Sequence, residues 1–112
     1  MRKTFGAKLP RERAQRVALL KALAYALVQR EKITTTHTRA KEVARLVERL
    51  ITKSKNKDFK TLNSFLGLRL AKKLVQVIAP KFKDRKGGYT RISKLGVRRS
   101  SSAPMAIVEF VA

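Results

Sequence analysis

The sequence predicts an α+β fold in which three to four helices pack on a small three-stranded sheet, with a basic arm at the N-terminus. Apolar residues recur at helical spacing through most of the first 80 residues, whereas β-branched and alternating segments dominate the last third. The chain has 112 residues, the length of one domain, so both kinds of segment must share one core. We therefore predict an arm, residues 1–10, and a single domain, residues 11–112.

The arm is strongly basic and leads into the first helix. Residues 1–16 contain six basic residues and one acidic residue, and Gly6 and Pro10 interrupt any early helix. Few apolar residues and many like charges predict that the arm is ordered only against a partner. A helix is expected from about residue 11 to residue 30. Its apolar stripe consists of Val17, Leu20, Leu23, Ala24, Leu27 and Val28.

Four β-branched residues in succession predict a short strand over residues 32–36. The alternative, a phosphorylation site among its threonines, is less favoured by this composition. Thr38 is the expected N-cap of a second helix that fades through the polar turn at residues 53–56. The apolar stripe of this helix is the most regular in the chain and consists of Ala40, Val43, Ala44, Val47, Leu50 and Ile51.

Two shorter helices are expected next. Asp58 should cap a third helix that Gly67 ends, and a fourth helix should run from about residue 69 until Pro80 ends it. The apolar residues predicted to face inward are Phe59, Leu62, Phe65 and Leu66 on the third helix and Ala71, Leu74, Val75 and Ile78 on the fourth.

The last third predicts a basic loop over residues 81–88 and strands over residues 89–95 and 105–111. A nine-residue loop is too short for a parallel crossover, so the two strands should pair antiparallel. The final strand is apolar on both faces apart from Glu109, which is typical of a central or well-covered strand. Gly88 is expected to hold a positive φ at the turn before Tyr89.

Composition excludes most site chemistries. There is no cysteine, and the one histidine, His37, has no acidic partner near it in the sequence, so thiolate or multi-histidine metal sites and catalytic triads are not expected. The longest apolar stretch, residues 17–28, is too short to span a membrane and is interrupted by Lys21. An amphipathic helix is favoured over a targeting segment there. We expect no cofactor, no metal, no membrane association and no small-molecule substrate.

The charge balance indicates a polyanionic partner. The chain carries 28 Lys and Arg residues against 7 Asp and Glu, a formal net charge of +21. Nucleic acid is the first candidate partner and an anionic membrane the second. The basic residues are spread through the fold, whereas one recognition helix in a DNA groove would concentrate them. The rival functions are a DNA-architectural protein, although no intercalating wedge is evident, and an RNA-modifying enzyme, although no acid–base pair or cofactor motif is evident.

Several blocks, in this order and spacing, are similar to a known family. The most specific are I-x-T-T at residues 33–36 and D-R-x-G-G-Y-T-R at residues 84–91. The shorter matching stretches are residues 30–32, 40–42, 50–52, 78–80, 94–95 and 103–106, and Glu109. Over nearly its whole length the chain resembles the bacterial-type large-subunit ribosomal protein numbered seventeen. It departs from the family's usual pattern in the arm, in Gln15-Arg16 and in Arg30.

The resemblance implies an α+β, non-enzymatic protein that binds large-subunit ribosomal RNA near the mouth of the peptide exit tunnel, beside other large-subunit proteins. It implies a location in the ribosome, in the cytoplasm or in an organelle. Tyr89 is either a core ring or a platform for a stacked base. The candidate RNA-binding residues are Arg2, Lys3, Lys8, Arg11, Arg13, Arg16, His37, Arg39, Lys83, Arg85, Lys86, Gly87, Gly88, Tyr89, Arg91, Lys94, Arg98 and Arg99.

Overall fold

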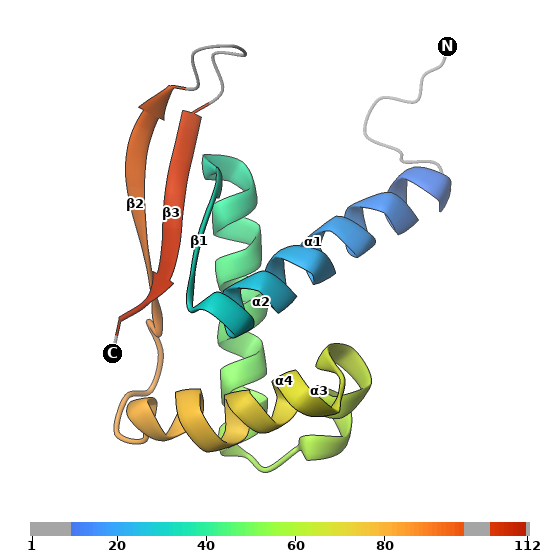
Figure 1. The fold of residues 1–112 in the computed structure, drawn as a ribbon, viewed down its shortest axis with the longest axis vertical. Coiled ribbons are helices and arrows are strands. Elements are labelled where there is room, and N and C mark those ends of the chain that lie inside the picture. The colour runs from blue at the N-terminus through green and yellow to red at the C-terminus, as the bar shows by residue number, and fades with distance from the viewer. Residues whose placement is uncertain (1–9, 98–103, 112) are drawn as a thin grey trace.

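A computed structural model describes residues 10–97 and 104–111. Helices pack on one face of a three-stranded antiparallel sheet, which confirms the predicted α+β fold (Figure 1). The elements are α1 (Pro10–Arg30), β1 (Lys32–Thr36), α2 (His37–Lys55), α3 (Phe59–Leu66), α4 (Leu68–Lys73), the π-helical turn η1 (Leu74–Ile78), the 3-10 turn η2 (Ala79–Phe82), β2 (Thr90–Val97) and β3 (Pro104–Phe110).

The sheet has the order β1-β3-β2, so the most apolar strand is central, which is one of the two predicted alternatives. Both neighbours pair with it antiparallel, and Val108 lies opposite Ile33 on one side and Ile92 on the other. Alternate residues of β3, namely Ala106, Val108 and Phe110, are buried beneath the helices.

The first helix confirms its predicted range but only part of its predicted core stripe. Ala24, Leu27 and Val28 near its C-terminal end are fully buried, whereas Val17 is 61% exposed. In Figure 1 the N-terminal half of α1 extends away from the sheet and α2. The prediction that Val17 is a core residue was therefore wrong, because the helix continues beyond the elements that cover its apolar face.

Glu31 fastens the end of α1 to three other elements. It has a left-handed backbone (φ 66°), and its carboxylate forms ion pairs with Lys73 and Lys81, both at 3.4 Å. Its carbonyl accepts a hydrogen bond from Phe110 N at 3.3 Å. Partial burial raises the pKa of Glu31, but the hydrogen bonds and charges of the two lysines outweigh it and hold the pKa below its ordinary value.

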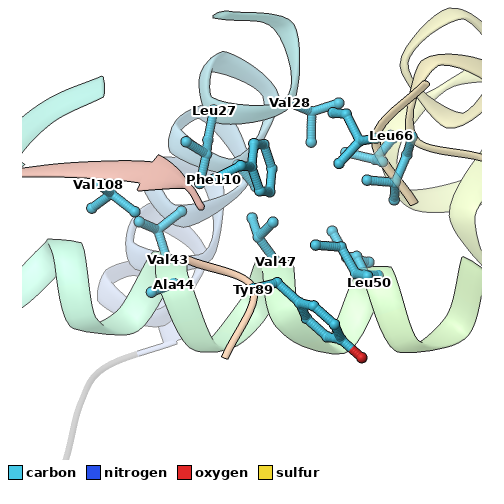
Figure 2. Close-up of a cluster of buried hydrophobic side chains, with 14 of the residues drawn as sticks. Leu27, Val28, Val43, Ala44, Val47, Leu50, Leu66, Tyr89, Val108 and Phe110 are labelled. Carbon is cyan, nitrogen blue, oxygen red and sulfur yellow. The ribbon is translucent and has the colours of Figure 1, made fainter. Parts of the chain in front are cut away.

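The core of the domain is built around α2. All six residues of the predicted stripe are buried, and Figure 2 shows Val43 and Val47 of this helix facing Leu27, Val108 and Phe110. The predicted N-cap was wrong. Thr36, not Thr38, caps α2, and its Oγ1 accepts a hydrogen bond from the N–H of Arg39 at 3.4 Å.

The third helix is capped by Asp58 and ends at Gly67, as predicted. The prediction that Phe59 faces the core was wrong, because this residue is 36% exposed. Pro80 does not end the following helical segment. It lies in the first turn of η2, where its missing N–H costs nothing, and the chain continues to Phe82.

Phe82 is a core residue within a segment predicted to be a basic loop. Its side chain is 1% exposed, and its ring centroid lies 5.1 Å from that of Tyr89 and 6.1 Å from that of Phe110. This aromatic contact anchors the start of the turn that follows. Within the described residues, no helix is long and apolar enough to cross a membrane.

Candidate nucleic-acid interface

The basic turn at residues 83–89 is held against α2 by polar contacts. Lys55 Nζ donates to the carbonyl oxygen of Arg85 and, at 3.1 Å, to the hydroxyl of Tyr89. Glu48 accepts from both the N–H (3.2 Å) and the hydroxyl (3.0 Å) of Thr90. These contacts fix both ends of the turn relative to α2.

The glycines of the turn have different backbones. Gly88 has a φ of 64°, as predicted from its position, and its carbonyl accepts a hydrogen bond from the Arg85 guanidinium at 3.3 Å. Gly87 lies outside the left-handed region and is exposed. The turn therefore has a defined shape before any partner arrives.

Tyr89 is a core ring. It is 2% exposed, packs on Phe82, and lies with its ring centroid 5.0 Å from the ammonium of Lys55. Figure 2 shows it beside Leu50 of α2, with its hydroxyl oxygen at the edge of the cluster. A ring buried in this way has no free face for a stacked base, so the stacking alternative was wrong.

A groove runs between α2 and the segment that follows the turn, and we call it the α2–β2 groove. It consists of two hollows of about 560 and 350 Å³, and Arg45 and Glu48 line both of them. Its walls are Lys41, Ala44, Arg45, Glu48, Arg49, Thr52, Lys53 and Asn56 on α2, and Lys86, Gly87, Tyr89, Thr90 and Ile92 opposite.

Four cations form a row along the α2 side of this groove, here called the basic ladder: Lys41, Arg45, Arg49 and Lys53. Each is four residues from the next, so all four lie on one face of the helix, about 6 Å apart along its axis. All four side chains are exposed.

Four carboxylates of the described domain contact groups other than the ladder cations. Glu42 pairs with Arg16 at 3.1 Å, Glu31 with Lys73 and Lys81, and Glu109 with Arg91 at 2.9 Å. Glu48, the acidic residue in the groove wall, accepts from Thr90. Within the described residues, no ladder cation has an ion-pair partner, so the groove is strongly electropositive.

Sequence reasoning missed the basic ladder. Basic residues at i, i+4, i+8 and i+12 were a usable signal, but exposed lysines and arginines occur on every helix of so basic a chain. The position of the glycine turn opposite α2 distinguishes this face from the others, and that position is a tertiary feature.

The structure brings only some of the predicted RNA-binding residues together. Lys86 and Gly87 line the α2–β2 groove with the buried Tyr89, and Lys83 and Arg85 flank a separate hollow beside η2. Arg91 lies on the sheet face away from the helices, where its hydrogen bond to Glu109 lowers the pKa of that carboxyl.

The remaining predicted residues lie on the first half of α1, near the start of α2, on β2 in the case of the exposed Lys94, or outside the described part of the chain. Desolvation and the charges of Lys41 and Lys94 lower the pKa of His37. Arg13, Arg16 and Arg39 are exposed, and the last two line a hollow between α1 and α2. The structure does not describe Arg2, Lys3, Lys8, Arg98, Arg99 or the side chain of Arg11.

Comparison with known proteins decides the family. The model of the family described as ribosomal protein L17 matches residues 19–111. A large ribosomal subunit protein bL17 of Aliarcobacter butzleri is 46% identical over 108 residues, covering 93% of each chain. One from Campylobacter jejuni is 51% identical over 109 residues, covering 94% of this chain and 93% of the relative.

This chain belongs to the ribosomal protein L17 family. Membership confirms the resemblance, and it confirms the expectation of a structural ribosomal protein of the large subunit, not an enzyme. The family therefore favours neither of the two rival functions considered for so basic a chain, the RNA-modifying enzyme and the DNA-architectural protein. The block D-R-x-G-G-Y-T-R, which carries most of the resemblance, is the turn that faces the basic ladder.

Proposed function

We propose that this chain binds large-subunit ribosomal RNA with the α2–β2 groove as its central contact. The observation that carries the proposal is the basic ladder, four exposed cations in one row with no acidic partner in the described structure, facing a fixed basic turn. A row of this kind matches the backbone of a nucleic-acid strand, whose phosphates also form a row of like charges.

The ladder is costly without a partner. Like charges four residues apart on a helix are destabilising by about 0.2–0.5 kcal/mol per pair, and the ladder contains three such pairs. Neutralisation by phosphates removes this repulsion and releases counterions, which favours binding. The repulsion is small in the free domain and is removed when RNA binds. This explains why the ladder cations have no acidic partner in the described structure.

The contacts expected here are to phosphates, which position the protein, not to base edges, which specify sequence. Among its described lining residues, the groove offers guanidinium, ammonium and main-chain donors and no exposed aromatic face. The buried Tyr89 contributes by supporting the turn through Phe82 and Lys55. We therefore assign the groove to the recognition of RNA shape and backbone.

A second contact surface is formed by the protruding half of α1 and the arm before it. Arg13 and Arg16 lie on this half, and the arm adds Arg2, Lys3 and Lys8. We propose that these residues reach RNA away from the groove, and that Arg98 and Arg99 do so after β2. The resemblance supports a place near the mouth of the exit tunnel, among neighbouring large-subunit proteins, in a cytoplasmic ribosome.

Sedimentation of purified large subunits tests the proposal. Subunits assembled with the tagged chain are washed in high salt, and the protein that stays bound is measured for the parent and for Arg45→Gln/Arg49→Gln. The control is Arg69→Gln/Lys72→Gln on α4, which removes the same charge outside the groove.

The proposal predicts that the groove variant is washed off at lower salt than the parent, whereas the control is retained. Equal retention of the two variants would show that the groove is not the central contact. Failure of the parent itself to sediment with large subunits, combined with binding to anionic vesicles, would replace RNA by a membrane as the polyanion.

A further inference from the structure

Gly87 is a glycine that the chain itself does not require. Its φ lies outside the left-handed region, and a Cβ built on it meets no heavy atom within 4 Å. Gly88, beside it, needs glycine for its φ of 64°. A glycine increases the entropy lost on folding, and neither a contact nor the backbone angle in the described structure accounts for one at residue 87.

The turn also carries main-chain donors without acceptors. In the described structure, the N–H groups of Lys86, Gly87 and Gly88 donate to no acceptor. Two carbonyls of the same turn are occupied, that of Arg85 by Lys55 and that of Gly88 by the Arg85 guanidinium. Unpaired donors and occupied acceptors give this turn a polarity that suits an anion.

Cations surround the same place. Lys86 precedes Gly87 on the turn, and Arg49 and Lys53 of the basic ladder line the same part of the groove. The groove there has a volume of about 560 Å³, which leaves room for a phosphate and its sugar. Within the described structure, a Cβ at Gly87 would point into open space, so this side of the residue is accessible to a ligand.

We propose that the turn binds one phosphate of the RNA through main-chain N–H groups, and that Gly87 is glycine so that this phosphate can approach. Lys86, Arg49 and Lys53 supply the charge, and the main chain supplies directed hydrogen bonds. This inference rests on the proposed function, since it assigns one phosphate contact within the α2–β2 groove.

The test compares Gly87→Ala with Lys86→Gln, using deproteinised large-subunit ribosomal RNA as the probe over a salt series. Gly87→Ala should leave the melting temperature unchanged or slightly higher, because no contact is lost and the unfolded chain is stiffened. Its affinity should fall about tenfold or more, the loss expected for one charge-assisted hydrogen bond. Its slope of log affinity against log salt should match that of the parent, because every cation is kept.

Lys86→Gln should behave differently and should flatten that slope by roughly 0.7–0.9. If Gly87→Ala binds like the parent while Lys86→Gln weakens binding, the proposed main-chain phosphate site is wrong, but the groove still contacts RNA. If neither variant changes binding, the turn side of the groove does not contact RNA and the main-chain phosphate site is wrong. If Gly87→Ala lowers the melting temperature, the amide chemical shifts of residues 86–88 are measured in the parent instead. The proposal predicts that these shifts change when RNA is added. Unchanged shifts would overturn it.

Discussion

Removing the Phe82 ring tests how the core supports the turn. Its side chain is 1% exposed and contacts Tyr89 and Phe110, so Phe82→Ala leaves a cavity between η2, the turn and β3. Truncation of a buried phenylalanine costs about 3–5 kcal/mol. That is a large share of the 5–15 kcal/mol by which domains are commonly stable.

The assay is thermal unfolding followed by circular dichroism. At roughly 4–8 °C per kcal/mol for a domain of about this size, Phe82→Ala should lower the melting temperature by at least about 12 °C. The control is Phe59→Ala on α3, whose ring is 36% exposed and which should shift the melting temperature far less. Equal shifts for the two variants, or a parent-like Phe82→Ala, would refute the assignment of Phe82 as the anchor of the turn.

Three further predictions concern other parts of the fold. Val47→Asp places an unpaired charge at a fully buried position of α2 and should cost roughly 3–5 kcal/mol, measured by urea unfolding. Gly88→Val should destabilise more than Gly88→Asn, since asparagine tolerates a φ of 64° far better than a β-branched residue, and equal denaturant midpoints would show that the turn is unstrained. Glu31→Gln should lower the melting temperature at neutral pH, because Lys73 and Lys81 lose their partner. The pKa of Glu31 is lowered by folding, so its contribution is present above the ordinary glutamate pKa and is lost as pH falls through the lowered value; the difference between variant and parent should therefore vanish in acid.

Sequence periodicity predicted which residues face the core but not how far the core extends. The stripe of α2 was right at every position, because the sheet and the other helices cover this helix along its length. The prediction that Val17 of α1 is buried was wrong, because periodicity identifies the apolar face of a helix but not where the elements that cover it end. Phe82 was missed for a related reason, since its partners Tyr89 and Phe110 arrive from later in the chain.

Local signals also could not choose among equivalent residues. Thr36 and Thr38 are both good N-caps, and only the geometry of the junction between β1 and α2 selects Thr36. For the site, the glycine turn was predictable because its residues are unusual in sequence. The basic ladder opposite was not, because its residues are ordinary and only the packing of the turn against α2, through Lys55 and Glu48, makes a groove of that face.

We expect the α2–β2 groove, and not the net charge alone, to hold the RNA. The direct measurement is the salt dependence of affinity for deproteinised large-subunit ribosomal RNA in two variants of equal charge. One changes the whole basic ladder, Lys41, Arg45, Arg49 and Lys53, to glutamine; the other changes Arg30, Lys60, Arg69 and Lys72, which are exposed and line no part of the groove. If all four ladder cations contact phosphates, the ladder variant should flatten the slope of log affinity against log salt by roughly 3, and the control by less than about 1. Equal slopes for the two variants would contradict the claim and would reduce the interaction to the overall charge of the chain.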